Sequence, residues 1–454
     1  MADALAHLYA AITARPADGV VGWRAGVAIC NAQFLARVQA WHALLRAQGG
    51  KQFALYLDDS VEFAAALLGG WHAEKTIWLS ADALPATVAS LTGMVDGFLG
   101  QFSNGLQPPT SGDTGTELVG ADLPADFPAL VVFTSGSTGA PEAIRKKLAQ
   151  LASEVATLER LFGAAAGAAA VFATVSHQHI YGLLFKVLWP LCSARPLHAL
   201  RIAYPGQLAL DLAGGPCVLV TSPAYLKRLP EHLDWRGAAR MLRAVFSSGG
   251  PLTLDVAVAT GAMLGQAPLE VYGSSETGGI AWRQRGAGSD DAWLPFPAVE
   301  WRLAGVDGTL EVRSPHLFDA NWLMLADCAA AVDARRFLLL GRNDRIVKIE
   351  EKRVSLTAME AALAASGLVI EVRVVPGAPV PGQRSTLAVF AVPAPDGRRL
   401  LDAAGKAALN ARLRAVLAGV VDAVALPRRW HYLDQMPVDA QGKTSLAALL
   451  ALAR

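Results

Sequence analysis

Hydrophobic positions along the first three quarters of the chain fall in short runs separated by longer amphipathic stretches. Runs typical of buried strands occur at residues 53–57, 170–175, 217–221 and 244–247. Apolar residues at helical spacing lie between them, and this alternation predicts an α/β fold with a largely parallel sheet. Residues 301–314 alternate differently, around a central Asp-Gly pair, and predict an antiparallel hairpin that closes the large domain.

The pattern changes after Gly341, where a charged stretch begins. The elements predicted beyond it are a helix at 357–365, strands at 368–375 and 386–392, and a helix at 403–417. A chain of 454 residues is too long for one ordinary core. We therefore expect a large N-terminal domain at residues 1–341 and a small α+β domain at residues 342–454.

A segment rich in hydroxyl groups and glycine follows one apolar run. Residues 131–142 read VVFTSGSTGAPE, and apolar positions at near-helical spacing resume at Ile144, so the segment is expected to join a strand to a helix. A flexible Ser/Gly linker has the same composition, but the flanking elements favour a phosphate-binding loop. The expected loop residues are Thr134, Ser135, Gly136, Ser137, Thr138 and Gly139. Glu142 adds a negative charge beside them.

Composition and charge exclude several other classes of protein. The 40 basic and 39 acidic residues give a net charge of +1, and no basic run indicates a nucleic-acid partner. The longest apolar run is interrupted by Lys186, so no membrane span is expected. The four cysteines lack metal-ligand spacing, and His177 and His179 lack a third ligand for zinc. The N-terminal residues do not resemble a signal peptide, which predicts a cytoplasmic protein.

Three later patches carry further polar chemistry. Residues 271–278 read VYGSSETG, where a glycine turn presents hydroxyl groups and the Glu276 carboxylate, a ligand type that Mg²⁺ prefers. Asp327 precedes a GRND sequence that begins at Gly341. Lys443 is an isolated cation near the carboxyl terminus, in a Gly-Lys-Thr sequence. Pro437 stands where a Walker-type loop needs its first glycine, so a P-loop NTPase is the weaker hypothesis.

In this order and spacing, the patches resemble the adenylate-forming superfamily, which contains acyl-CoA synthetases, firefly luciferases and nonribosomal peptide adenylation domains. The resemblance covers most of the chain. The loop TSGSTGAPE is similar to the family's T-S-G-[ST]-T-G-x-P-K, VYGSSE to Y-G-x-T-E and Ala326-Asp327 to T-G-D. GRNDRIVK is similar to G-R-x-D-x-x-x-K, PVDAQGK to P-x-x-x-x-G-K and residues 179–182 to H-x-x-G.

The resemblance implies an enzyme that transfers AMP from ATP to a carboxylic acid, releases pyrophosphate and passes the acyl group to a thiol. By this resemblance, Lys443 bridges the carboxylate and the α-phosphate, and Glu276 carries Mg²⁺. Asp344 is the hinge about which a mobile C-terminal domain rotates. The nucleotide-binding residues implied are the phosphate loop, Gly249, Tyr272, Gly273, Ser275, Asp327 and Arg342. The acid-binding residues implied are His179, Tyr181, Ser248 and Gly249.

Two residues depart from the family pattern. Glu142 replaces a lysine that holds the β- and γ-phosphates, and the cations just downstream that could replace it are Arg145, Lys146 and Lys147. Glu351 replaces a glycine beside the pantetheine arm of coenzyme A. The thiol acceptor is therefore coenzyme A or an acyl carrier protein. A degenerate homologue that binds nucleotide without turnover is the alternative from another class.

A narrower resemblance concerns the acid. The short length, the VKIEEKRVSL stretch and the missing glycine are similar to compact ligases of aryl polyene and xanthomonadin-type pigment pathways. This resemblance implies an aromatic acid such as 4-hydroxybenzoate. Glycine backbone in the predicted pocket suits a planar ring, and a short fatty acid is the alternative substrate.

Overall fold

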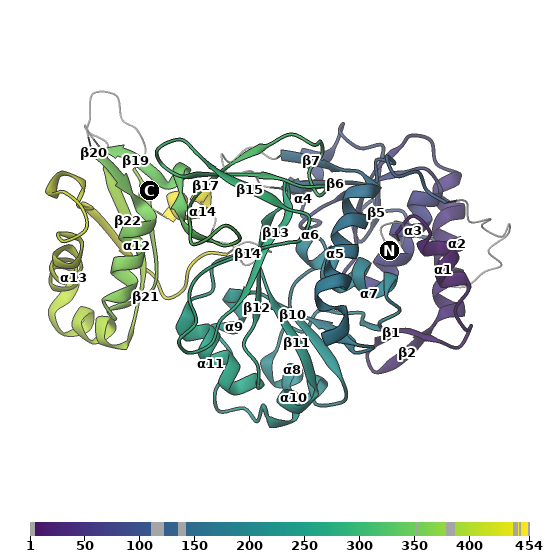
Figure 1. The fold of residues 1–454 in the computed structure, drawn as a ribbon, viewed down its shortest axis with the longest axis horizontal. Coiled ribbons are helices and arrows are strands. Elements are labelled where there is room, and N and C mark those ends of the chain that lie inside the picture. Colours follow the sequence, from purple (N-terminus) through teal and green to yellow (C-terminus); the bar gives the residue numbers. More distant parts are fainter. Residues whose placement is uncertain are drawn as a thin grey trace. The chain divides into compact units, whose positions relative to one another are not determined.

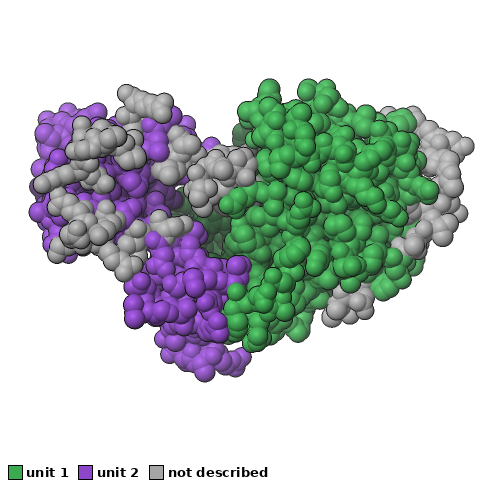
Figure 2. Space-filling model, turned by 90° about the horizontal axis from the view of Figure 1, so that it is seen from above, with its two compact units in different colours: residues 1–300, 313–322 green, residues 301–312, 323–454 purple. Residues whose placement is uncertain are grey.

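The computed structural model describes residues 5–109, 122–134, 142–349, 352–377, 386–438, 444 and 446–452. Two compact units are present: unit 1 contains residues 1–300 and 313–322, and unit 2 contains residues 301–312 and 323–454 (Figure 2). Several mixed sheets and a smaller α+β C-terminal part confirm the predicted fold class. The predicted boundary between residues 341 and 342 lies within unit 2 and stays a prediction.

Unit 1 contains a nine-stranded sheet with the order β14-β13-β12-β11-β10-β8-β9-β1-β2. Its strands are β1 (Val20–Arg24), β2 (Val27–Cys30), β8 (Ala170–Ala173), β9 (Leu197–His198), β10 (Cys217–Thr221), β11 (Leu242–Ser247), β12 (Leu269–Ser274), β13 (Gly278–Gln284) and β14 (Leu294–Pro295). The strands from β12 to β1 run parallel, and antiparallel pairs lie at both ends. All of β10 is buried, as its continuous apolar run predicts.

A second, five-stranded sheet of unit 1 has the order β5-β3-β4-β6-β7. Its strands are β3 (Gln52–Tyr56), β4 (Thr76–Leu79), β5 (Gly97–Gly100), β6 (Leu130–Thr134) and β7 (Glu142–Lys146). The expectation that the phosphate loop joins a strand to a helix is wrong, because β7 intervenes and pairs antiparallel with β6. Ile144 pairs with Val132 in this ladder, so its fit to the helical spacing was a coincidence. Helix α5 (Leu148–Ala166) begins only after Lys147.

Helices cover the sheets of unit 1 (Figure 1). Besides α5 they are α1 (Leu8–Thr13), α2 (Asn31–Arg46), α3 (Ser60–His72), α4 (Pro85–Leu91), α6 (Ile180–Gly182), the π-helix η1 (Leu183–Leu188), α7 (Trp189–Cys192), α8 (Pro205–Leu212), α9 (Pro223–Leu226), α10 (Arg236–Met241) and α11 (Leu254–Leu264). Helix α3 is buried almost all round and contacts α2, β4, β9 and η1. It therefore joins the two sheets through their shared core.

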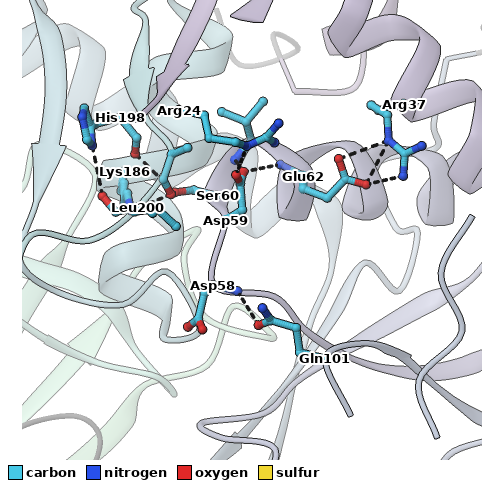
Figure 3. Close-up of polar contacts among 12 residues, drawn as sticks. Arg24, Arg37, Asp58, Asp59, Ser60, Glu62, Gln101, Lys186, His198 and Leu200 are labelled. Carbon is cyan, nitrogen blue, oxygen red and sulfur yellow. Dashed lines mark hydrogen bonds and ion pairs between the residues drawn. The ribbon is translucent and has the colours of Figure 1, made fainter. Parts of the chain in front are cut away.

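Polar contacts at the start of α3 reinforce this junction (Figure 3). Asp59 accepts hydrogen bonds of 2.9 Å from two amides of the first helical turn and pairs with Arg24 of β1. The Ser60 amide donates to the carbonyl of Ala199 at 2.8 Å. Lys186 of η1 donates to the same carbonyl from its Nζ at 3.4 Å. An ion pair thus links α3 to β1, and hydrogen bonds to the shared Ala199 carbonyl link α3 to η1.

Unit 2 contains a four-stranded, a three-stranded and a two-stranded sheet. Its elements are β15 (Glu300–Ala304), β16 (Thr309–Arg313), β17 (Leu323–Ala331), β18 (Phe337–Arg342), η2 (Asn343–Arg345), β19 (Ile346–Ile349), β20 (Lys352–Ser355), α12 (Leu356–Ala365), β21 (Val369–Pro376), β22 (Leu387–Pro393), α13 (Pro395–Leu417), η3 (Ala423–Ala425), β23 (Arg429–Tyr432) and α14 (Leu446–Leu452). The predicted helices at 357–365 and 403–417 and strands at 368–375 and 386–392 are confirmed. Helix α13 begins earlier than predicted and is kinked at Gly405, whose φ is 77°.

Buried side chains of α12 and α13 pack against β21 and β22 in the core of unit 2. The strands β15 and β16 are neighbours joined by residues 305–308, as the predicted hairpin requires. Across the described ranges, no helix is both long enough and apolar enough to cross a membrane.

Candidate active site

The carboxyl ends of parallel strands gather several predicted site residues at one edge of the nine-stranded sheet. His179 follows β8, Ser248 and Gly249 follow β11, and Tyr272 lies near the end of β12. A side-chain hydrogen bond of 2.7 Å links neighbouring strands at this edge. It joins Thr174, which follows β8, to Thr221, the last residue of β10. Ligands of α/β sheets bind at such carboxyl edges.

The segment from His177 to His179 forms a turn that leads into α6 and η1. A Cβ added at Gly182 would lie 1.9 Å from the Ser176 carbonyl oxygen, so only glycine fits there. His179 is half-buried as the residue preceding α6, and the Tyr181 ring lies 4.9 Å from that of Phe185. Nε2 of the buried His177 faces the Leu57 carbonyl at 2.8 Å. Burial, aided by the charge of Lys186, lowers the pKa of His177 well below its ordinary value, so this imidazole is neutral.

The end of β11 has an open backbone. Ser248 donates from Oγ to the Val271 carbonyl at 2.8 Å, which ties β11 to β12 and occupies the hydroxyl proton. Gly249 has a φ of +91°, and a Cβ added at Gly249 or Gly250 would meet no described atom within 4 Å. A flat group could therefore lie against this glycine pair, while Ser248 holds its position.

Tyr272 is held by an aromatic and basic stack. The Tyr272 ring lies 5.6 Å from the Trp293 ring. The Arg283 guanidinium in turn lies 4.1 Å from the centre of the Trp293 ring. Arg283 also pairs with the buried Glu270 at 2.9 Å. Gly273 follows Tyr272, and a Cβ there would lie 2.2 Å from the Gly278 carbonyl oxygen, so the reversal from β12 to β13 needs glycine.

The turn between β12 and β13 presents the predicted metal-binding acid. Thr277 closes the turn, because its Oγ1 accepts the Ser274 amide at 2.9 Å and its amide donates to Ser274 Oγ at 3.2 Å. Glu276 is exposed at the tip and Ser275 is half-buried. We refer to residues 274–278 as the Glu276 turn.

Buried side chains from other elements hold the main chain of the Glu276 turn. Lys146 at the end of β7 donates from Nζ to the Glu276 carbonyl at 3.0 Å and to the His316 carbonyl at 3.2 Å. Glu154 of α5 accepts the Gly279 amide at 2.9 Å, and His316 Nδ1 lies 2.9 Å from the Gly279 carbonyl. Burial lowers the pKa of Lys146, and the charges of Glu154 and Glu276 oppose that shift.

Sequence reasoning missed this support. Lys146 was considered only as a substitute for the missing loop lysine, whereas its ammonium group is bound to two main-chain carbonyls. Gln150 and Glu154 gave a usable signal, because they are polar residues four apart on the otherwise apolar face of α5. Gln150 donates to the same His316 carbonyl at 2.9 Å. No sequence pattern pointed to His316.

Two predicted nucleotide ligands belong to unit 2. Asp327 of β17 and Arg342 of β18 face each other in an antiparallel ladder, with 3.6 Å between Oδ2 and Nη1. The main chain of Asp344 lies in the short helix η2 that follows β18. The ladder thus places an acid and a base side by side directly before the predicted hinge.

Several predicted site residues lie outside the described ranges: Ser135, Gly136, Ser137, Thr138, Gly139, Glu351 and Lys443. Thr134 is described as the last residue of β6. The roles predicted for the residues outside the described ranges stay predictions.

Residues 81–318 match the family of AMP-binding enzymes. The chain belongs to this family. It is 32% identical over 328 residues to a 4-coumarate–CoA ligase of Rhodobacter capsulatus, covering 69% of this chain and 74% of that protein. Two solved structures share the fold: ATP-bound MatB from Rhodopseudomonas palustris (19% identity, TM-score 0.78, 99% and 98% of the two chains) and a benzoate CoA ligase from Burkholderia xenovorans (18%, 0.77, 98% and 99%).

Membership in the AMP-binding enzymes confirms the resemblance to the adenylate-forming superfamily. It also confirms the predicted enzyme class, an AMP-forming acid–thiol ligase that uses ATP. Of the predicted residues of this AMP-binding enzyme, the structure brings His179, Ser248, Gly249 and Tyr272 to one sheet edge in unit 1.

Proposed function

We propose that this AMP-binding enzyme activates an aromatic carboxylic acid of the 4-hydroxybenzoate class and transfers the acyl group to coenzyme A. The observation that carries the choice of acid is an aromatic series leading to open backbone. Tyr181 packs on Phe185, whose ring lies 5.0 Å from that of Phe246 on β11. The open pair Gly249 and Gly250 follows three residues later. Phe185 and Phe246 are buried, so the surface open to a planar ring is the glycine backbone that follows them.

The comparisons support the same class of acid. Two relatives are named 4-coumarate–CoA ligases, at 32% and 28% identity, and a structure with the same fold is a benzoate CoA ligase. The sequence resemblance to compact pigment-pathway ligases also favours an aryl acid, and with it a role in pigment biosynthesis.

The proposed reaction has two steps. A carboxylate oxygen attacks the α-phosphorus of ATP, and the bond between the α-phosphorus and the oxygen that bridges to the β-phosphate breaks. Pyrophosphate departs with that oxygen, and the product is an acyl-adenylate. The thiolate of coenzyme A then attacks the acyl carbon and AMP leaves. Lys443 supplies positive charge between the carboxylate and the α-phosphate, and removing such a donor costs about 10²-fold or more in rate. The phosphate loop holds the triphosphate, Tyr272 packs against adenine, and Asp327 accepts the ribose hydroxyls.

The donor set of the Glu276 turn fits Mg²⁺. Among the described residues, no cluster of three or more His, Cys, Asp or Glu side chains could hold a metal by itself. Mg²⁺ does not need such a cage, because it is commonly bound by one or two carboxylates together with substrate phosphates and water. Glu276 offers an exposed carboxylate of this kind. When bound, the ion neutralises charge on the phosphates.

Acid-dependent release of pyrophosphate tests this function. The wild-type protein is incubated with ATP, MgCl₂ and a panel of benzoates, cinnamates and fatty acids, and pyrophosphate is measured with and without coenzyme A. We expect the highest kcat/KM with a hydroxylated benzoate and loss of at least 10²-fold in Lys443→Ala. Preference for fatty acids would overturn the aromatic assignment. No release with any acid, and no effect of Lys443→Ala, would favour the degenerate homologue.

Transfer to an acyl carrier protein is the second candidate, because Glu351 replaces the glycine that the family places beside the pantetheine arm. The same assay decides it when AMP release is compared with coenzyme A and with a holo carrier protein at equal thiol concentration. AMP release that depends on coenzyme A alone would eliminate this candidate.

A further inference from the structure

The ammonium group of Lys146 is an unusual support for an exposed turn. The Lys146 side chain is 1% exposed, and its Nζ donates to the carbonyls of Glu276 and His316 at 3.0 and 3.2 Å. Burying an ammonium group is costly unless it is fully hydrogen-bonded. A chain that only needed to fill this space could place an apolar residue there at no such cost.

The bonds of Lys146 act at a defined point of the Glu276 turn. The carbonyl of residue 276 belongs to the peptide that leaves Glu276, so fixing it restricts the backbone dihedrals that aim the Glu276 side chain. The amide and carbonyl of Gly279 are held three residues later by the buried Glu154 and His316. The main chain is therefore held at the tip of the turn and on its β13 side by side chains from β7, α5 and the segment around His316.

The register of β7 adds a link to the phosphate loop. Lys146 pairs with Leu130 at one end of the β6–β7 ladder, and Glu142 pairs with Thr134 at the other, where the loop begins. The strand that carries the loop thus also carries the ammonium group that holds the Glu276 turn. Charge-assisted hydrogen bonds are about twice as strong as neutral ones, which suits a contact between two sheets.

We propose that Lys146 is a positioning residue for adenylation: it fixes the main chain of the Glu276 turn so that the Glu276 carboxylate is aimed at the divalent cation of the nucleotide. This inference rests on the proposed role of Glu276 as a metal ligand. Lys146 itself touches neither nucleotide nor acid in this role.

The test uses Mn²⁺ as a paramagnetic probe of the cation position. Free Mn²⁺ is measured by electron paramagnetic resonance with full-length protein and a non-hydrolysable ATP analogue, and binding to the analogue alone is subtracted. The variants are Lys146→Met, Lys146→Arg and Glu276→Gln. Lys75→Met is the matched control, because Lys75 is another buried lysine whose Nζ donates to two main-chain carbonyls, those of Gln48 and Gly50 at 2.9 and 2.7 Å.

We expect Lys146→Met to weaken Mn²⁺ binding about tenfold, as for loss of one charge-assisted hydrogen bond. Lys146→Arg keeps a charged donor and should restore binding to within about threefold. Lys75→Met should lower the melting temperature and leave the Mn²⁺ affinity unchanged. Should Lys146→Met not fold, Lys146→Gln, which keeps a shorter donor, takes its place.

Wild-type Mn²⁺ affinity in a folded Lys146→Met or Lys146→Gln variant would overturn the positioning role. An equal loss in Lys75→Met would do the same, because the effect would then be one of general stability. Wild-type Mn²⁺ affinity in Glu276→Gln would show that Glu276 is not the metal ligand, and the positioning role of Lys146 would then fall with it. Failure of the wild type to release pyrophosphate with any acid would instead remove the proposed function.

Discussion

Glu142 is the residue that most alters the expected charge of the phosphate loop. It is exposed at the start of β7, opposite Thr134. Of the three nearby cations, Lys146 is bound to main-chain carbonyls, and the Lys147 Nζ lies 4.4 Å from the centre of the Phe318 ring. Arg145 is exposed and, being one residue away in a strand, lies on the face of β7 opposite to Lys146. Lys146 is therefore the least available of the three to bind phosphate.

We predict that Glu142→Lys lowers the KM for ATP about three- to tenfold, because it removes repulsion and adds attraction near the triphosphate. The kcat should change less, since the proposed mechanism assigns the α-phosphate to Lys443. Pyrophosphate release at varied ATP concentration measures both constants. Glu231→Lys, the same change at an exposed residue between α9 and α10, is the control and should leave the KM unchanged. A higher KM in Glu142→Lys would contradict the prediction.

At the scale of elements, the π-helix η1 buries a charged group beside the predicted acid-binding segment. Lys186 is fully buried, and its Nζ donates to the Ala199 carbonyl at 3.4 Å (Figure 3). Burial lowers the pKa of Lys186 to about 7, although Asp59 opposes this shift. The element thus carries an amine that changes charge near neutral pH.

The sign of its effect on stability follows from proton binding. Above pH 7 the unfolded chain holds a proton on Lys186 that the folded protein has released, so stability rises with pH up to about 10.5. At or below pH 7 the folded protein carries the full cost of the buried ammonium group. We predict that Lys186→Met stabilises the protein by roughly 2–4 kcal/mol at pH 6.5 and by much less at pH 9.5.

Urea unfolding followed by circular dichroism at the two pH values measures this difference. Lys227→Met, at the exposed residue directly after α9, is the control and should show no such pH dependence. An equal change in stability at both pH values would show that the substitution acts through packing and not through charge.

The elements that sequence reasoning predicted well are those whose own pattern is decisive. The strand β10 is a continuous apolar run, and the helix α12 has a clear apolar period, so both were found within a residue of their ends. The strand β7 was missed because its ladder partner β6, not its own residues, specifies it. The π-helix η1 was missed for a related reason, since an apolar run does not record which backbone hydrogen bonds its residues make.

The candidate site divides in the same way. The Glu276 turn and the glycines at 249 and 273 were named as site residues from the sequence, because tight turns and polar motifs have recognisable local sequence patterns. Lys146, Glu154 and His316 act on that turn from sites 37 to 130 residues away along the chain. Such support depends on tertiary packing, which no local pattern encodes.

At the scale of the whole molecule, the predicted reaction needs two arrangements of one chain. In the proposed mechanism Lys443 serves adenylation and then gives way to the thiol, which the family resemblance attributes to rotation about Asp344. The main chain of Asp344 lies in the short helix η2, between β18 and β19 of unit 2. A hinge of this kind absorbs its change in φ and ψ at a few residues that end an element.

Asp344→Pro tests the hinge because proline fixes its own φ near −65° and restricts the residue before it. We predict that this variant keeps one half-reaction within about threefold of wild type and slows the other by at least tenfold, since one of the two arrangements is lost. Adenylation is measured by pyrophosphate exchange, and thioester formation by mixing the synthetic acyl-adenylate with coenzyme A. Asp344→Ala, which leaves φ and ψ free, should support both steps. Equal slowing of the two half-reactions by Asp344→Pro alone would mean that the residue maintains structure and that rotation occurs elsewhere.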